Sequence, residues 1–265
     1  MELTRTARHT PRLRVLDTAG STNDVLAELN RANPEPSLST VITLDQTSGR
    51  GRLGRVWTAP KGKTLAASVL VRPGVIVGRS SFPFGWIPLL AGAAMCTSVD
   101  ALIGEGRTGL KWPNDVQVDG LKVCGVLAEL VPAGDAVIVG TGVNLTLTEE
   151  ELPVPTATSL ALAGVTTAGD DLVDLVLSRY LATLGELVDR LVATAGDEAA
   201  SGIHRVVSEW CRTIGRAVRV SLPSGEDLFG VAIGIDSTGR LLVRADGKDE
   251  IAAVAAGDVT HLRYE

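Results

Sequence analysis

In the first half of the chain, segments with the apolar spacing of a helix alternate with short segments typical of β-strands. Apolar residues from Val25 to Leu29 have helical spacing, and the hydroxyl of Ser21 or Thr22 would cap that helix. Residues 86–103 are apolar on nearly every face, which predicts a helix buried against a sheet. Short β-branched runs predict strands, because such side chains fit a pleated surface. These strands are expected at 14–17, 41–45, 64–71, 121–130 (after an Asp119-Gly120 hairpin turn) and 136–141, and residues 142–145 are expected to leave the sheet.

The second half begins with helices and ends with strands. Residues 170–194 carry the apolar stripe of a long amphipathic helix, and a second helix is predicted over 199–213. From residue 215 the pattern changes to short strands separated by turn sequences, as in small β-barrels. We therefore expect a larger domain of residues 1–214 and a small β domain of residues 215–265. The strands expected in the small domain are 217–220, 228–235, 240–245 and 250–254.

The composition argues against several classes of protein. A formal net charge of −6 over 265 residues is unlike a general nucleic-acid binder, whose surface would be strongly basic. Cys96, Cys124 and Cys211 are odd in number and widely spaced, without a disulfide or metal-binding pattern. The N-terminus has no signal-peptide pattern, and the apolar run 86–96 is too short to span a membrane. We expect a cytoplasmic protein that does not act at a membrane.

One loop has distinctive chemistry. Between Gln46 and Trp57, three glycines alternate with three arginines in an otherwise acidic chain. Glycines let the backbone approach a ligand, arginine binds phosphate or carboxylate through two hydrogen bonds, and an indole can cover a planar ring. The loop suits an anionic ligand that bears a ring, but it is neither a Walker loop nor a dinucleotide-binding loop. The alternative is a basic surface loop that contacts nucleic acid or nothing.

Two polar positions allow a structural and a functional interpretation. Ser21 can simply cap a helix, or it can join Asn23 in binding a polar ligand group at the helix N-terminus. By two-residue alternation, Lys122 shares a face with Cys124 and Val126 in a very apolar strand. Lys122 is either an edge lysine whose charge reaches solvent or a cation that faces a phosphate. The loop arginines favour the phosphate interpretation.

Five motifs occur in one order, and together they are highly specific. From residue 14 to about residue 265, the chain closely resembles the biotin protein ligases. The resemblance implies an α/β fold of the α+β type, with a mixed-sheet catalytic domain followed by a small SH3-like β-barrel. The motifs are Gly20-Ser21-Thr22-Asn23, Gln46 with the GRGRxGRxW run of residues 49–57, Lys111-Trp112-Pro113-Asn114-Asp115, Lys122-x-x-Gly125-Val126-Leu127-x-Glu129 and Gly142-Val143-Asn144.

The resemblance also implies an activity and a site. Biotin's carboxylate would attack the α-phosphorus of ATP to give biotinyl-5′-AMP, with Mg²⁺ required to offset the repulsion between anions. Arg52 and Lys122 are the expected catalytic residues, and Asp115 would help to position Mg²⁺ or Lys122. The expected biotin site is Ser21, Thr22, Asn23, Gln46, Gly49, Arg50, Gly51, Arg52, Lys122, Gly125 and Val126. The expected ATP site is Arg52, Arg55, Trp57, Asn114, Lys122 and Asn144.

The resemblance implies a partner and excludes others. The biotinyl group would pass to a lysine of a biotin carboxyl carrier protein domain of an acyl-CoA or pyruvate carboxylase. Because the motifs begin at Gly20, we expect a monofunctional ligase without the N-terminal DNA-binding domain of some family members, and no DNA partner. The rival enzyme is a lipoate ligase or octanoyl transferase, which the GRGRxGRxW loop and the C-terminal β domain disfavour. We also expect residues 47–55 to be mobile without ligand and ordered with it.

Overall fold

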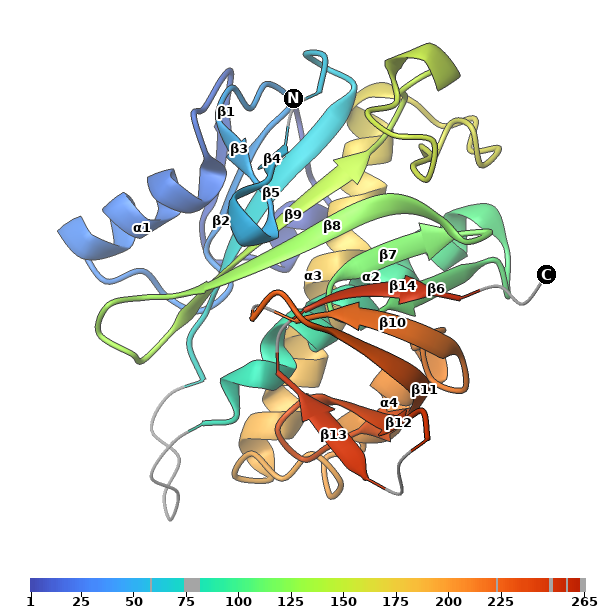
Figure 1. Ribbon diagram of the computed structural model, residues 1–265. Coiled ribbons are helices and arrows are strands. Elements are labelled where there is room, and N and C mark those ends of the chain that lie inside the picture. Colours follow the sequence, from blue (N-terminus) through green and yellow to red (C-terminus); the bar gives the residue numbers. More distant parts are fainter. Residues whose placement is uncertain (58, 74–81, 223, 248–249, 256, 263–265) are drawn as a thin grey trace.

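A seven-stranded mixed sheet forms the centre of the molecule (Figure 1). The computed structural model describes residues 1–57, 59–73, 82–222, 224–247, 250–255 and 257–262. Neighbouring strands in the sheet are antiparallel except β1 and β2, which are parallel. The strands, in their order across the sheet, are β1 (Leu13–Leu16), β2 (Thr40–Thr43), β5 (Thr64–Val71), β9 (Val137–Asn144), β8 (Leu121–Leu130), β7 (Asp115–Val118) and β6 (Thr108–Lys111).

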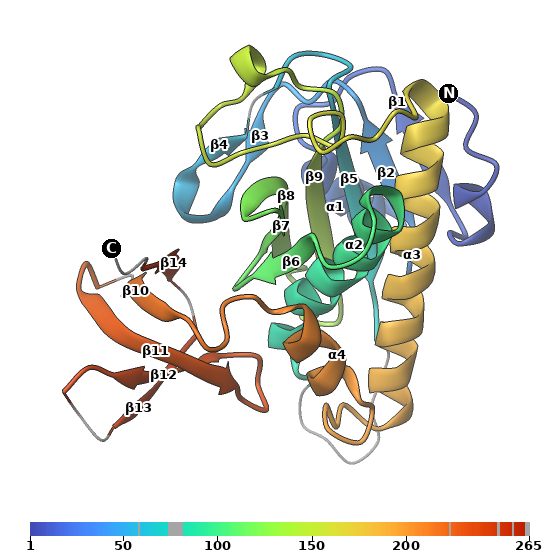
Figure 2. The same cartoon turned by 90° about the vertical axis from the view of Figure 1, so that its right-hand side faces the viewer.

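Helices cover both faces of this sheet. Helices α2 (Ile87–Ile103) and α3 (Gly169–Ala193) lie side by side on one face, as Figure 2 shows, whereas α1 (Thr22–Ala32) packs on the other face. Alternation along β5 divides its side chains, because Val69 joins the core of α2 and α3 while Leu70 contacts the core of α1. The predicted strands and the two long helices are therefore confirmed.

Helix α2 is apolar all round because protein surrounds it. The sheet, α3 and α4 (Ile203–Trp210) all pack against it. Residues Phe84–Ile103 have the length and hydropathy of a membrane span, but 67% of the stretch that meets this criterion is buried inside the protein. This is the burial expected of a core helix. Short 3₁₀ helices lie at Thr6–Arg8, Arg52–Gly54, Phe84–Trp86 and Glu149–Glu151.

The C-terminal strands form a second, five-stranded antiparallel sheet, an SH3-like domain. Two buried indoles join it to the larger sheet: Nε1 of Trp86 donates to the Ser237 carbonyl at 2.9 Å, and Nε1 of Trp112 donates to that of Gly239 at 3.2 Å. Both acceptors lie in the turn between β11 and β12. The strands, in sheet order, are β13 (Ile251–Val254), β12 (Leu241–Ala245), β11 (Asp227–Ile235), β10 (Ala217–Ser221) and β14 (Asp258–His261).

Several sequence predictions were wrong at element ends. Strand β9 does not end before Gly142 but continues to Asn144, because β5 and β8 pair with it on both sides. Helix α4 covers only the centre of the predicted segment 199–213. Strand β14 was not predicted. By contrast, Asp119 and Gly120 have φ values of 51° and 81°, so the predicted hairpin turn between β7 and β8 is confirmed.

Candidate functional site

A cavity of about 540 Å³ lies on the side of the sheet that carries α1. Its wall combines the start of α1, the loop 46–57, parts of β7, β8 and β9, and β14 of the C-terminal sheet. All the residues expected from the sequence line it except Gly49. The wall has two chemically different ends. The neutral end comprises Ser21, Thr22, Asn23 and Gln46, with Ser68 hydrogen-bonded to Thr22 and Asn23 from outside the cavity lining. The cationic end comprises Arg52, Arg55, Lys111 and Lys122 with the carboxylates Asp115 and Asp258.

The loop 46–57 folds as a small hairpin. Strand β3 (Gly49–Arg50) pairs with β4 (Val56–Trp57), and Gly49 lies opposite Trp57. A Cβ at Gly49 would lie 2.4 Å from the Trp57 carbonyl oxygen and 2.5 Å from Nε2 of Gln46. Glycine is therefore needed here for packing within the hairpin. This account differs from the ligand contact expected from the sequence.

The Arg50 guanidinium is held by two carboxylates. It donates to both oxygens of Asp24 at 2.6 and 2.7 Å, and to the carboxylate of Glu129 at 3.3 Å. Hydrogen bonds from Arg50 lower the pKa of Asp24. The hairpin is thus tied to α1 and to β8.

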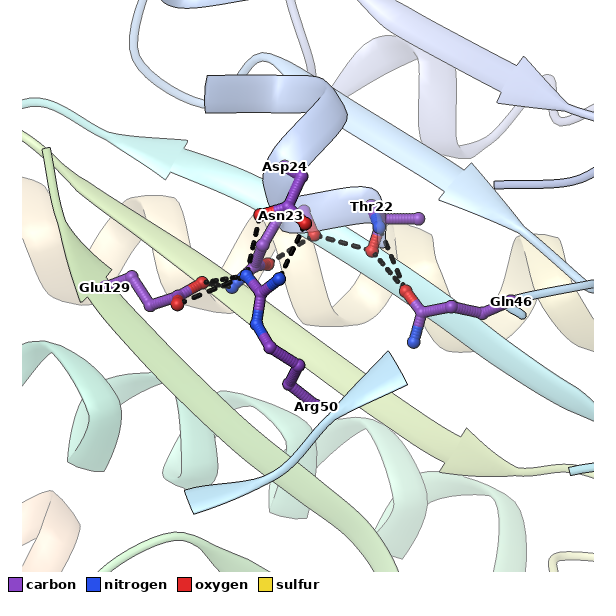
Figure 3. Close-up of polar contacts among 7 residues, drawn as sticks. Thr22, Asn23, Asp24, Gln46, Arg50 and Glu129 are labelled. Carbon is purple, nitrogen blue, oxygen red and sulfur yellow. Dashed lines mark hydrogen bonds and ion pairs between the residues drawn. The ribbon is translucent and has the colours of Figure 1, made fainter. Parts of the chain in front are cut away.

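A chain of hydrogen bonds links the side chains of the neutral end (Figure 3). The Thr22 N–H donates to Oε1 of Gln46 at 2.9 Å. Ser68 Oγ lies 2.7 Å from the Thr22 hydroxyl and 2.6 Å from Oδ1 of Asn23. Nδ2 of Asn23 donates to Glu129 at 2.5 Å. Ser21 is the N-cap residue of α1 but makes no side-chain cap hydrogen bond, so the predicted cap is wrong and Gln46 takes that role.

The cationic end gathers four positive groups around two carboxylates. Nζ of Lys122 lies 2.6 Å from Oδ1 of Asp115, and Arg55 pairs with Asp258. Arg52 donates to Oδ1 of Asn114 and to the Gly257 carbonyl, both at 3.3 Å. Gly257 and Asp258, at the start of β14, therefore contact two arginines of the loop.

Burial perturbs two of these cations. Desolvation lowers the pKa of the Arg52 guanidinium, and the nearby Arg55 lowers it further, while Asp115 opposes the shift. Desolvation likewise lowers the pKa of Lys111, with further lowering by Lys122 and Arg55 against the opposing charge of Asp115. Partly desolvated cations bind an anion more strongly than hydrated ones do, because less water must be displaced. The end is therefore suited to a highly charged anion such as a polyphosphate.

An indole lies against the sheet beside these cations. The ring of Trp57 lies so close to Gly142 that a Cβ there would be 2.7 Å from it, and Nζ of Lys122 lies 5.6 Å from the ring centroid. Glycine at 142 is thus required by the indole. Asn144, predicted on the ATP side, lines the cavity and donates to the Thr158 carbonyl at 2.8 Å.

The predicted shared face of Lys122, Cys124 and Val126 is wrong in part. The register of β7 against β8 shifts, so that Gln117 pairs with Lys122 while the adjacent Val116 pairs with Cys124. The Lys122 ammonium therefore reaches the cavity, whereas Cys124 is fully buried in the core. The functional interpretation of Lys122 is the one that fits this position.

Sequence reasoning missed several residues in or next to the cavity. Lys111 and Glu129 stand in recognised motifs but had no assigned role. Ser68 lies within the apolar centre of β5, and Asp258 begins the strand that was not predicted. Within the described ranges, no group of three or more His, Cys, Asp or Glu side chains could hold a metal ion.

Comparisons with known proteins match both parts of the chain. Residues 15–145 match the biotin/lipoate A/B protein ligase family, and residues 213–262 match the biotin protein ligase C terminal domain. A biotin–[acetyl-CoA-carboxylase] ligase of Mycobacterium tuberculosis is 41% identical over 95% of this chain and 89% of that protein. A bifunctional ligase/repressor of Bacillus spizizenii is 29% identical over 92% of this chain and 72% of that protein. The structure of an Aquifex aeolicus biotin protein ligase in complex with biotin and ATP is 26% identical and superposes with a TM-score of 0.71, covering 96% of this chain and 100% of that one.

Proposed function

The chain belongs to the biotin protein ligase family, and from this premise we propose how its own residues activate biotin with ATP and transfer it to a carrier protein. The observation that carries the proposal is the two-ended cavity. A neutral end rich in hydrogen-bonding groups suits biotin's ureido ring, and a cationic end suits the triphosphate. A ligand that fills both ends has the shape and charge of biotinyl-5′-AMP. The C-terminal family match favours biotin over lipoate as the acid.

The first step needs charge neutralisation. A carboxylate oxygen of biotin attacks the α-phosphorus of ATP, an acyl-phosphate bond forms, and the bond to the departing pyrophosphate breaks. Two anions must approach each other, so positive charge placed at the reacting phosphate lowers the barrier. We assign this role to Arg52 and Lys122. Lys111 and Arg55, in the same end of the cavity, would contact the remaining phosphates.

The other cavity residues would position the two substrates. Ser21, Thr22, Gln46 and the backbone from Arg50 to Gly51 are proposed to bind the ureido head, with Asn23 supporting them. Gly125 and Val126 would contact the biotin ring and tail. Trp57, Asn114 and Asn144 are proposed to contact the adenylate.

Mg²⁺ is expected to accompany ATP. A carboxylate is the hard oxygen donor that Mg²⁺ takes from proteins, with phosphate oxygens and water completing its coordination. We propose Asp115 as this donor, because it lines the cationic end beside Lys122. When bound, Mg²⁺ would neutralise part of the triphosphate charge.

The second step requires an acceptor rather than a protein nucleophile. The mixed anhydride is already activated, so the amine of a carrier lysine can attack its acyl carbon and release AMP. We propose that the acceptor is a biotin carboxyl carrier protein domain of an acyl-CoA or pyruvate carboxylase, and that the reaction takes place in the cytoplasm. The relative's name, which specifies acetyl-CoA carboxylase, supports this class of partner.

We propose that catalysis uses two domains, residues 1–214 and 215–265. The start of β10 at Ala217 and the C-terminal family match from residue 213 support this boundary. The second domain would complete the cationic end through Asp258 on β14.

Isotope exchange between pyrophosphate and ATP tests the proposed function directly. Biotin should support exchange, whereas lipoate or no added acid should not, because a buried polar site rejects a ligand that leaves its groups unpaired. Equal exchange with lipoate would contradict the assignment of biotin. Exchange without any acid would contradict adenylation of a carboxylate.

A further inference from the structure

The hydrogen bonds of the neutral end have a fixed direction. We propose that Glu129 sets this direction and is thereby a specificity-determining positioning residue for the ureido head of biotin. The inference rests on the proposed function. It concerns Glu129 and Ser68, which do not line the cavity but hydrogen-bond to residues that do.

At the Glu129 end of this series of hydrogen bonds, the side chain can only accept. Glu129 forms an ion pair with Arg50, and a carboxylate in an ion pair only accepts hydrogen bonds, so Asn23 must present Nδ2 to it, at 2.5 Å. Asn23 then presents Oδ1 to Ser68, at 2.6 Å. Oδ1 of Asn23 lies close to Gly140, where a Cβ would be 2.5 Å from it.

The direction of hydrogen-bond donation is then fixed at the hydroxyl groups of Ser68 and Thr22 as well. An amide oxygen only accepts, so Ser68 must use its single proton on Asn23. The 2.7 Å contact between Ser68 and Thr22 consequently requires Thr22 to donate. Ser68 is fully buried, so water does not offer its hydroxyl group an alternative partner, whereas Thr22 lines the cavity.

The result is a wall that presents acceptors. The other end of the chain is also fixed, because the Thr22 N–H requires Oε1 of Gln46 to face it at 2.9 Å. Oγ1 of Thr22 lies 3.2 Å from Oε1 of Gln46, within hydrogen-bond distance, but when Thr22 gives its single proton to Ser68, neither oxygen has a proton to offer the other. Two adjacent acceptors favour a ligand that brings an N–H between them, and a ureido N–H has this chemistry.

Reversing the direction would remove this preference. In Glu129→Gln, the new amide can donate to Asn23. Asn23 can then turn, Ser68 can donate to Thr22, and Thr22 can donate to Gln46. The neutral end would satisfy itself without a ligand, and biotin's N–H would have to displace an existing hydrogen bond.

The test is steady-state pyrophosphate exchange on the full-length protein. Glu129→Gln should raise the KM for biotin about tenfold, the effect of roughly one hydrogen bond, while kcat and the KM for ATP change less than about twofold. Desthiobiotin keeps the ureido group but lacks the thioether, so its KM should rise by the same factor. Ser68→Ala interrupts the same chain and should give a similar increase. The double variant should be no worse than either single one.

Asp24→Asn is the matched control. It removes the other carboxylate that holds Arg50 but leaves the contact between Glu129 and Asn23 intact. Its KM for biotin should change less than about twofold. An equal effect of Asp24→Asn would overturn the proposal in favour of simple tethering of the hairpin. Additive effects of Glu129→Gln and Ser68→Ala, or an unchanged KM in Glu129→Gln, would also overturn it.

Two further results separate failure of the proposal from other failures. Thermal unfolding checks that each variant is folded, and Ser68→Ala carries the same prediction if Glu129→Gln does not fold. If the wild-type protein shows no biotin-dependent exchange, the proposed function itself fails. If the wild type is active and the variants behave as the control does, only the role of Glu129 fails.

Discussion

The two ends of the cavity bind polar groups by opposite means. At the neutral end, buried hydroxyl and amide groups bond mainly to one another, and each has a defined donor or acceptor role. At the cationic end, four positive side chains face two carboxylates, and several of these groups are partly exposed. Hydrogen-bond directionality discriminates between ligands of similar size, whereas net charge attracts any sufficiently anionic ligand. We infer that selectivity for the acid resides at the neutral end and that the rate of chemistry depends on the cationic end.

The largest effect should follow loss of a cation at the reacting phosphate. Lys122→Ala should lower kcat for adenylation about a hundredfold, as expected for removal of one group that stabilises developing charge. The KM for biotin should change much less. Arg205→Ala removes a positive charge from the exposed surface of α4 and should leave the kinetics unchanged. Wild-type exchange in Lys122→Ala would mean that the lysine has only a structural role.

Loss of Arg52 should loosen retention of the intermediate. Arg52 joins the hairpin to Asn114 and to the Gly257 carbonyl, so Arg52→Gly removes both ties as well as a phosphate contact. The variant should still form adenylate but release it, and labelling of an unrelated protein such as albumin should rise about tenfold. The companion measurement is protease cleavage within residues 47–55 with and without biotin and ATP. Leakage equal to wild type, with cleavage that does not depend on ligand, would contradict a closing role for the hairpin.

The positive charges of the cationic end should also affect how the free energy of unfolding depends on pH. Burial, Lys111 and Arg216 lower the pKa of His261 from 6.5 to about 4. The unfolded chain therefore binds the proton first, so the contribution of His261 is complete above pH 6.5 and is lost as pH falls towards 4. Allowing for its partial exposure, the loss should be about 1–2 kcal/mol. Chemical denaturation of wild type and His261→Gln across this range measures it, and identical pH profiles would contradict the shift.

The smallest expected effect is a different response of the two ends of the cavity to salt concentration. Raising the ionic strength screens partly exposed charges, so the KM for ATP should rise about threefold between low and physiological salt. The KM for biotin should not change, because uncharged hydrogen bonds are insensitive to screening. Parallel increases in both constants would mean that the two ends do not act independently.

The sequence predicted most helices and strands, but it predicted their ends and their pairing less well. Continuous apolar runs such as β5 and α2 carry a strong local signal, because the protein surrounds them on every side. Strand β14 has no such signal: of its four residues, only Val259 is buried. The irregular pairing that turns Lys122 into the cavity depends on β7 and could not be inferred from alternation within β8 alone.

The candidate site was predictable where a motif carried it. The GRGRxGRxW and KWPND motifs indicated the loop and strand ends that form much of the cationic end. The chain from Thr22 to Glu129 could not be predicted, because its members lie far apart in sequence and only folding brings them together: Asn23 and Glu129 are 106 positions apart. The contribution of Asp258 was missed for the same reason, since it faces Arg55 from another sheet.

The three cysteines provide a reporter of protein motion. Cys96, Cys124 and Cys211 are free and buried in the core. Burial raises the pKa of all three thiols, that of Cys124 to about 12, so the reactive thiolate is scarce at neutral pH. Alkylation must then await transient opening of the core, and its rate measures how often the native protein opens. Ligands that bind only the closed protein should slow this reaction in proportion to their occupancy, which gives a binding assay that needs neither a label nor turnover.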